Sequence, residues 1–192
     1  MKAATLTILL TSVICLAIGQ EIEIDKIDDF TGVRSISTKS MTGKYFKKTD
    51  FVDKANQVSF STIYSKVKTG NEYWYLYFMF SFLVDSPFGC LSEYDGKIIL
   101  LLANDSTLTL DQVSKTSCNN YVNGAYYSIR ASANETDLIM HQGRINELFE
   151  ELSNVEIKKM RVYGTEGSHD FEFKDEKRNI VSLHIKFIKS KL

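Results

Sequence analysis

The chain has 192 residues, which is enough for one domain with a substantial core and too many for a minimal disulfide-held fold. Hydrophobic residues make up 44% of the sequence and charged residues 24%, with a single proline, and this composition excludes a disordered chain. The 23 basic and 24 acidic side chains nearly cancel, so the chain lacks the basic excess that drives binding to nucleic acid.

The N-terminus has the pattern of an export signal. Lys2 precedes an apolar run, and small residues occupy the positions that a signal peptidase reads before a cleavage near Gly19. We therefore expect a signal peptide over residues 1–19, with residues 20–192 forming a single α+β domain in the periplasm or outside the cell. The apolar run of about 13 residues is too short to cross a bilayer, so an uncleaved anchor is a weaker alternative. Lipidation at Cys15 is also a weaker alternative, because the residues before this cysteine fit a lipobox poorly.

Strands are predicted through the first half of the mature chain. Residues 21–25 alternate between polar and apolar side chains, which predicts an edge strand, and residues 28–32 have turn composition. The same alternation predicts a strand over 58–67, followed by a turn at 69–71. Residues 73–84 are almost all aromatic or aliphatic, and we interpret them as a long central strand.

The next elements are hairpins identified by their turns. Asp95-Gly96 and Asn123-Gly124 are dipeptides that accept the positive φ angles of tight hairpin turns, and strand-like residues flank both. Residues 164–167 are predicted to join a strand over 157–163 to its return over 169–173, with Phe171 and Phe173 facing inward.

Helical periodicity appears in two places. Apolar residues recur at helical spacing over 138–152, after Thr136-Asp137 as a cap. Residues 179–189 fit both a strand and a helix, and we favour the strand. The sum is an α+β fold, mainly an antiparallel β-sheet with one or two helices packed on a face.

Cysteine usage agrees with export. Cys90 and Cys118 remain after the leader is removed, and an even pair in an oxidising compartment favours a disulfide bond between them, with two free thiols as the alternative. The histidines have no metal-ligand spacing with either cysteine, so we expect no metal ion and no cofactor.

The sequence contains only weak signals of catalytic residues. Ser168, His169 and Asp170 are the residue types of a hydrolytic triad, but neighbours on a strand point to opposite faces, so they are not expected to converge. His141 lies on the apolar stripe of the predicted helix and is expected to be structural. Acidic pairs such as residues 150–151 are expected to face solvent. We therefore predict no catalytic residue.

One aromatic cluster is a candidate binding site. On a strand, Tyr73, Tyr75 and Tyr77 share one face, while the other face carries core residues. The tyrosine face is expected to lie under the predicted helix. The alternative is an amphipathic platform for a glycan or a peptide.

The segment Asp29-Phe30-Thr31-Gly32, followed by Ile36-Ser37-Thr38-Lys39, resembles the start of a group of small exported bacterial proteins of unassigned function, which often open with a D-x-F-T-G segment after the leader. The strand over 157–163 and its return over 169–173 are similar to their C-terminal hairpin. The resemblance implies a cell-envelope or secreted protein, and it brings no catalytic residues.

These observations favour an exported binding or interaction module with a protein or glycan partner. No nucleic-acid partner is expected, and no stable membrane insertion once the leader is removed. One alternative is a hydrolase that acts on cell-envelope material through an unmarked active site. Another is a structural or assembly component that works through its sheet edges.

Overall fold

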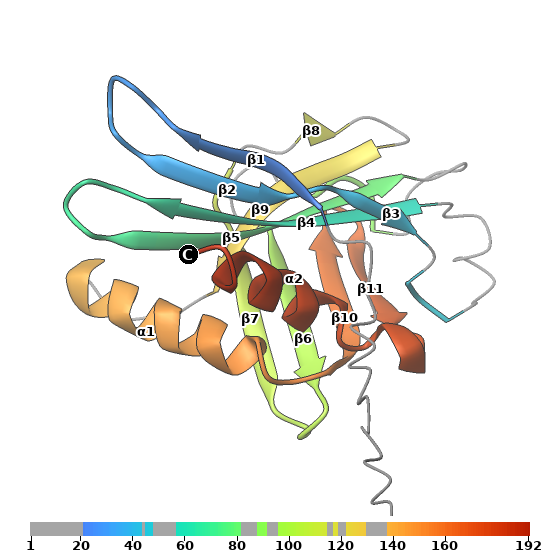
Figure 1. Cartoon of the computed structure of the whole chain (residues 1–192). Helices are drawn as coiled ribbons and strands as arrows, with labels where there is room; N and C mark the ends of the chain where they lie inside the picture. The colour runs from blue at the N-terminus through green and yellow to red at the C-terminus, as the bar shows by residue number, and fades with distance from the viewer. Residues whose placement is uncertain are drawn as a thin grey trace, which may run out of the picture.

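The computed structural model describes residues 21–43, 45–47, 57–81, 88–91, 96–114, 117–118, 122–129 and 138–192 (Figure 1). The predicted leader, the Thr136-Asp137 cap and Asp95 lie outside these residues. The described strands form one sheet with two helices, which confirms the predicted α+β class.

The strands are β1 (Ile22–Ile27), β2 (Arg34–Thr38), β3 (Met41–Gly43), β4 (Gln57–Lys66), β5 (Glu72–Ser81), β6 (Lys97–Leu102), β7 (Thr107–Gln112), β8 (Ser117–Cys118), β9 (Val122–Ile129), β10 (Ile157–Gly164) and β11 (Gly167–Glu172). The helices are α1 (Leu138–Leu152) and α2 (Ile180–Lys189), and a short 3₁₀ turn η1 (Asp175–Lys177) precedes α2.

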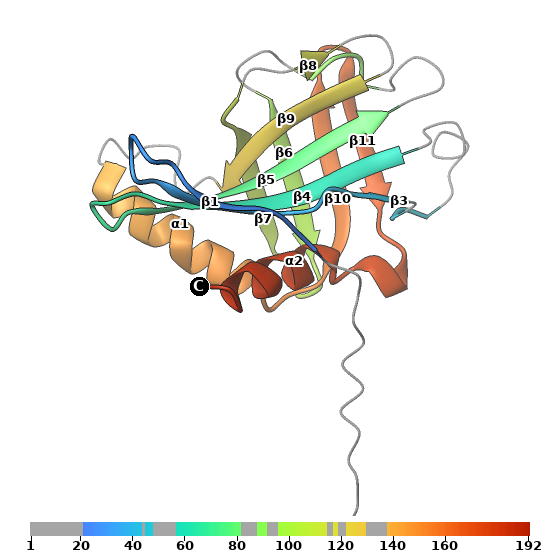
Figure 2. The same ribbon diagram turned by 45° about the horizontal axis from the view of Figure 1, so that its top comes forward.

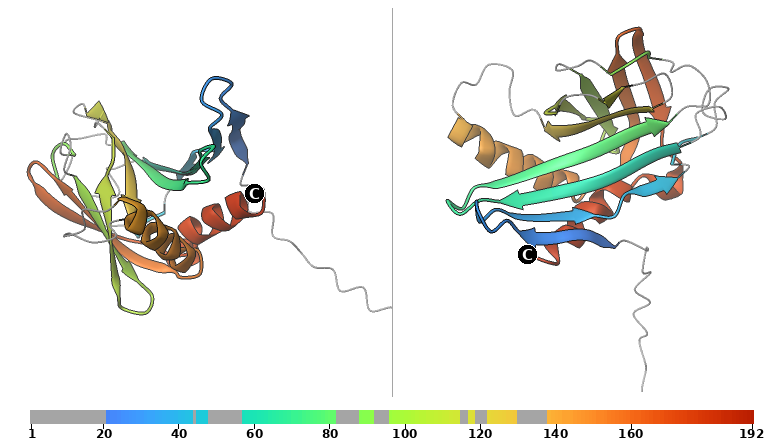
Figure 3. Two further views of the ribbon diagram at one scale, coloured as in Figure 1. Left: turned by 90° about the vertical axis from the view of Figure 1, so that its left-hand side faces the viewer. Right: turned by 90° about the horizontal axis from the view of Figure 1, so that it is seen from above.

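The sheet runs in the order β1-β2-β4-β5-β9-β7-β6-β10-β11, with β3 beside β4 and β8 beside β9. Every described pairing is antiparallel. The sheet bends so that β6, β7, β10 and β11 cross the direction of β4 and β5 (Figure 2). Both helices lie on the inner side of this bend (Figure 3).

Strand β5 lies in the interior of the sheet, as the apolar run over 73–84 predicts, and it pairs with β4, the strand predicted from the alternation over 58–67. Residues 82–84 of the predicted strand lie outside the described residues. All ten residues of β4 lie opposite residues of β5, from Gln57 opposite Ser81 to Lys66 opposite Glu72. Four inner-facing side chains of β5 are at most 4% exposed. They are Trp74, Leu76, Phe78 and Phe80.

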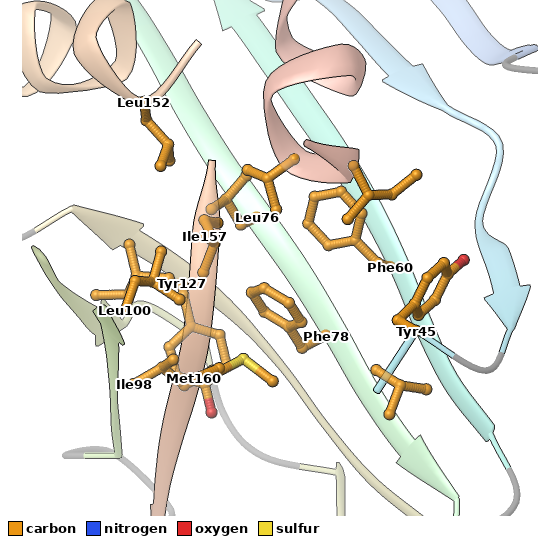
Figure 4. Close-up of a cluster of buried hydrophobic side chains, with 14 of the residues drawn as sticks. Tyr45, Phe60, Leu76, Phe78, Ile98, Leu100, Tyr127, Leu152, Ile157 and Met160 are labelled. Carbon is orange, nitrogen blue, oxygen red and sulfur yellow. The ribbon is translucent and has the colours of Figure 1, made fainter. Parts of the chain in front are cut away.

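The core fills the space between the two halves of the bent sheet. Phe78 and Leu76 on β5 point toward Met160 and Ile157 on β10 (Figure 4). The segment after β3 also reaches the far edge of the sheet, because Phe46 forms a bridge with Phe173 just beyond β11. The segment after β3 and the end of β11 are therefore tied to one core.

Helix α1 forms over the range predicted from its apolar spacing. Phe149 is fully buried and stacks on Trp74 of β5, with ring centroids 5.6 Å apart. The helix therefore covers the inner face of β5.

The C-terminal segment is a helix, so the expectation of a strand over 179–189 is wrong. Helix α2 buries one stripe, made of Ile180, Val181, His184, Ile185 and Ile188. On a strand, Leu183 and Phe187 would share the face of Val181 and Ile185, yet both are only half-buried. The two patterns overlap at Val181 and Ile185, and packing against β2 and β4 selects the helix.

The hairpin predictions had mixed outcomes. Gly164 and Gly167 face each other across the β10–β11 turn, as expected, and Gly167 has a φ of +124°. The turn predicted at Asn123-Gly124 is wrong, because both residues lie within β9, opposite Phe80 and Met79 of β5. Pairing with β5 and β8 on its two sides holds this dipeptide extended.

The hairpin expected at Asp95-Gly96 is not formed by β6. Gly96 does precede β6, but the partners of that strand are β7 and β10, which both follow it in the chain. The turn of the β6–β7 hairpin instead contains Asp105, whose φ is +66°. Asn104 stabilises this turn by accepting a hydrogen bond from the backbone N–H of Ser106 at 3.1 Å.

Candidate binding face

The predicted tyrosine ladder lies on the outer face of the sheet. Tyr73, Tyr75 and Tyr77 alternate along β5 with core residues such as Trp74, and all three are half-buried. Because Phe149 of α1 stacks on Trp74, the helix lies on the opposite side of the sheet from the tyrosines. The expectation that a helix covers the tyrosine face is therefore wrong: seen from outside, the described helices lie behind β4 and β5 (Figure 3, right).

The strand register places serines beside these tyrosines. Ser65 lies opposite Tyr73, Ser61 opposite Tyr77, and Ser35 of β2 continues the row from Ser65. The hydroxyl oxygens of Ser35 and Ser65 are 3.3 Å apart, within hydrogen-bond distance. Outer-facing side chains of β2, β4, β5 and β9 together form what we call the tyrosine–serine face. Its described members are Ser35, Ser37, Ser59, Ser61, Ile63, Ser65, Tyr73, Tyr75, Tyr77, Met79 and Tyr126.

The tyrosine rings continue from β5 onto β9. Tyr126 lies opposite Tyr77, with ring centroids 4.7 Å apart and planes inclined by 41°. Tyr126 is 39% exposed, so this pair presents aromatic surface to solvent. Successive tyrosines on β5 are about 7 Å apart because alternate residues of a strand share a face.

No acidic or basic residue is among the described members of the face on β2, β4, β5 and β9. Charged residues continue the same side of the sheet beyond them, because Lys26 of β1 lies opposite Ser35 and Asp111 of β7 lies opposite Ser128 of β9. Partial burial raises the pKa of Tyr75 and of Tyr77, with smaller contributions from Tyr73 and Tyr126 respectively. Both phenols are therefore neutral at physiological pH. Neutral rings and hydroxyl groups bind by apolar contact and hydrogen bonding rather than by ion pairing.

The period of β5 predicts that Tyr73, Tyr75, Tyr77 and Met79 share one face, but it does not predict which residues of other strands lie beside them. The alternation over 58–67 shows that Ser59, Ser61 and Ser65 share a face, but it does not show which strands are neighbours. Tyr126 joins the face through the β5–β9 pairing, and the turn wrongly predicted at Asn123-Gly124 concealed this pairing.

The sequential Ser168, His169 and Asp170 do not form a triad. Asp170 makes two hydrogen bonds to the Arg161 guanidinium, at 2.5 and 2.7 Å, and these hydrogen bonds lower the pKa of the carboxyl group. His169 packs against the ring of Phe171 at 4.8 Å, and burial lowers its pKa. The side chains of Asp170 and His169 therefore lie on opposite faces of β11.

Other polar groups singled out in the sequence have structural surroundings. Glu150 and Glu151 are exposed, as expected, and Glu150 accepts a hydrogen bond from Lys189 of α2, which lowers the pKa of its carboxyl group. His141 lies on α1, and its side chain is outside the described residues.

The two cysteines lie on different segments. The backbone N–H of Cys90 donates a hydrogen bond to the Thr165 hydroxyl at 3.1 Å, and Cys118 lies on β8 opposite Asn123 of β9. The side chain of Cys118 is outside the described residues, so the disulfide bond stays a prediction.

The described part of the chain offers neither a metal site nor a membrane-spanning helix. There, no group of three or more His, Cys, Asp and Glu side chains is placed to hold a metal ion. The described helices also include none that combines the length and the apolar character needed to span a membrane.

Comparisons of the chain with protein-family models, with curated proteins and with solved structures found no match. Inferences about function therefore start from the geometry of the chain itself.

Proposed function

We propose that this protein is an exported binding module that holds a neutral glycan on its tyrosine–serine face, in the periplasm or outside the cell. The observation that carries the proposal is a row of half-buried tyrosines with the half-buried Ser35 and Ser65 beside it, while Ser37, Ser59 and Ser61 of the face are buried. No acidic or basic residue is among the described members of the face on β2, β4, β5 and β9. Removal of residues 1–19 and a disulfide between Cys90 and Cys118 belong to the same proposal.

The chemistry of a sugar ring fits this surface. A pyranose has faces of C–H groups, which pack on aromatic rings, and a rim of hydroxyl groups, which exchange hydrogen bonds with side chains such as Ser65 and Tyr77. Tyrosine supplies a large, rigid contact surface with a polar tip, so it loses little conformational entropy on binding. Along β2, β4, β5 and β9 the described members offer an anionic glycan no cation, and Lys26 lies beyond them on the edge strand β1.

The location of the face also suits a long ligand. The tyrosines follow β5 from Tyr73 to Tyr77 and continue sideways to Tyr126, so several sugar units could contact aromatic rings at once. Weak contacts at each unit would add along the chain, which is how an open surface can bind without a deep pocket.

Isothermal titration calorimetry of the mature protein tests this proposal. The probes are neutral cello-, xylo-, manno- and chito-oligosaccharides, with oligogalacturonate as an anionic comparison. We expect at least one neutral probe to bind, and Tyr75→Ala to weaken its binding by about tenfold, equivalent to about 1.4 kcal/mol. Tyr163→Ala on β10 is the matched control, because Tyr163 is also half-buried but lies outside this face. Failure of every neutral probe, or equal binding by the Tyr75→Ala variant, would contradict the proposal.

A further inference from the structure

The turn between β1 and β2 is held by several hydrogen bonds. One carboxylate oxygen of Asp28 accepts hydrogen bonds from the backbone N–H of Phe30 at 3.1 Å and from the backbone N–H and hydroxyl of Thr31, each at 2.7 Å. The backbone N–H of Gly32 donates to the Asp28 carbonyl at 2.7 Å. Gly32 has a φ of +67°, a conformation that favours glycine.

The Phe30 side chain lies at the tip of this turn and, unlike those of Asp28 and Thr31, takes part in none of its described hydrogen bonds. Asp28, Thr31 and Gly32 each stabilise the turn, whereas the Phe30 side chain is 98% exposed. Burial of a phenyl ring is favourable and exposure is not, so a polar residue would serve the turn at least as well. The hydrogen-bonded backbone of the turn thus presents an aromatic ring to solvent.

The surroundings of Phe30 restrict what can bind it. Residues 21–39 carry five acidic and three basic side chains, a net charge of −2. The neighbouring turn, residues 66–72, adds Lys66, Lys68 and Glu72, which leaves the combined net charge at −1. Arg34 is paired with Asp25 by hydrogen bonds of 3.1 and 3.0 Å, and Lys39 is paired with Glu21, so each pair is neutral and the net charge of −1 is carried by the remaining residues, which include Asp29.

This charge argues against a lipid surface and for a protein. An anionic membrane attracts clusters of basic residues, which this hairpin lacks. A single ring also provides less apolar area than one acyl chain, and one acyl chain alone gives only marginal membrane binding. By contrast, a single aromatic side chain that fills a pocket on a protein can dominate an interface.

We infer that Phe30 is the anchor of a protein–protein interface, and that its partner is a protein with an apolar pocket rimmed by basic side chains. Asp29, which is exposed beside Phe30, would face this rim. Ile27 is 63% exposed and extends the apolar surface from the turn onto β1. This inference concerns a different surface from the tyrosine–serine face and does not rest on the proposed function.

The experiment compares wild-type protein with Phe30→Ser and Val113→Ser variants immobilised as mature chains. Val113 is a matched control, because it is apolar, 50% exposed and placed just beyond β7. Proteins retained from an envelope extract of the source organism are quantified by mass spectrometry. A candidate partner is a protein that the wild type and Val113→Ser retain but Phe30→Ser does not. Each candidate is then purified and titrated against the wild type and each variant.

The inference predicts that a purified partner binds the wild type and binds Phe30→Ser at least about tenfold more weakly. Asp29→Lys should also weaken this binding, and Tyr75→Ala should leave it unchanged. Equal retention by the wild type and Phe30→Ser would overturn the inference. Phe30-dependent binding to vesicles of zwitterionic or anionic phospholipid would overturn it in favour of a membrane, and a Phe30-dependent dimer would overturn it in favour of a second copy.

Discussion

The imidazole Nδ1 of His184 lies 2.8 Å from the hydroxyl oxygen of Thr38, where α2 packs against β2. His184 is fully buried, and its ring meets that of Phe60 edge to face at 4.8 Å. In the described part of the chain, its other nitrogen, Nε2, has no hydrogen-bond partner. A proton added to this ring would therefore place a charge in apolar surroundings.

This burial predicts that stability falls in mild acid. It lowers the pKa of His184 from 6.5 to about 4, so between these values the unfolded chain binds more protons than the folded one. The contribution of neutral His184 to the free energy of unfolding is complete above pH 6.5 and is lost progressively as the pH falls toward 4. We expect the free energy of unfolding, measured with urea, to decrease by about 2 kcal/mol between pH 7 and pH 5.

A His184→Gln variant tests the assignment, because it should lose most of this pH dependence whatever its absolute stability. Burial also lowers the pKa of His169, which contributes with the same sign. His169→Gln is therefore the matched control, and it should keep the dependence due to His184. An unchanged slope in His184→Gln would refute this origin.

Gly164 is predicted to be intolerant of a side chain. A Cβ atom there would meet the backbone carbonyl oxygen of Phe88 and would lie 2.6 Å from that of Cys90. Neither carbonyl can move freely, because they accept hydrogen bonds from the backbone N–H groups of Glu166 and Thr165. Gly164→Ala should lower the free energy of unfolding by about 1 to 3 kcal/mol. Ser168→Ala, at an exposed site beside the same turn, should leave it nearly unchanged, and equal effects would contradict the argument.

Cys90 and Cys118 are predicted to be joined in the exported protein. The bond would close a loop of about 29 residues, so reducing it should lower the free energy of unfolding by about 3 to 4 kcal/mol on the chain-entropy account. Intact-mass analysis after alkylation under denaturing conditions should find neither thiol modified unless a reductant is added first. Alkylation of both without reductant would exclude the bond.

Strand β1 is predicted not to pair with a second copy of itself. Opposite residues of an antiparallel pair point to the same face of the sheet. When two copies of β1 pair about a two-fold axis, each residue must therefore lie opposite one from the same face, which allows only every second register. The central registers place Asp25 opposite Asp25, Lys26 opposite Lys26, or Glu23 opposite Asp25. Like charges oppose pairing in each, and the register shift between Ile22 and Ile24 makes the edge irregular.

Sedimentation velocity at high protein concentration should therefore find a monomer. A concentration-dependent dimer that strengthens in a Lys26→Gln variant would instead support the assembly alternative, in which sheet edges join copies of the chain.

Local patterns predicted the fold best where one period dominated. The alternation over β4 predicted that strand, the apolar run over β5 predicted that strand and its buried face, and the apolar spacing predicted α1. At α2 two periods overlapped, and burial of His184 beside Thr38, which no local pattern encodes, favours the helix. The dipeptide Asn123-Gly124 fits a turn, but its pairing with β5 holds it in a strand.

The candidate site was only partly predictable for the same reason. The period of β5 placed three tyrosines on one face, but which face a helix covers depends on long-range contacts such as Phe149 on Trp74. Phe30 could be recognised only from the structure. In the sequence it is one residue of a turn segment with Asp28 and Gly32, and only the structure shows that its side chain is 98% exposed.

The most direct test of the account follows backbone amide signals by nuclear magnetic resonance while a neutral oligosaccharide is added to the mature protein. Glycan binding on the outer sheet face predicts the largest shifts at Tyr73, Tyr75, Tyr77 and Tyr126, with little change at Tyr163. Shifts confined to other residues, or none with any neutral probe, would contradict it.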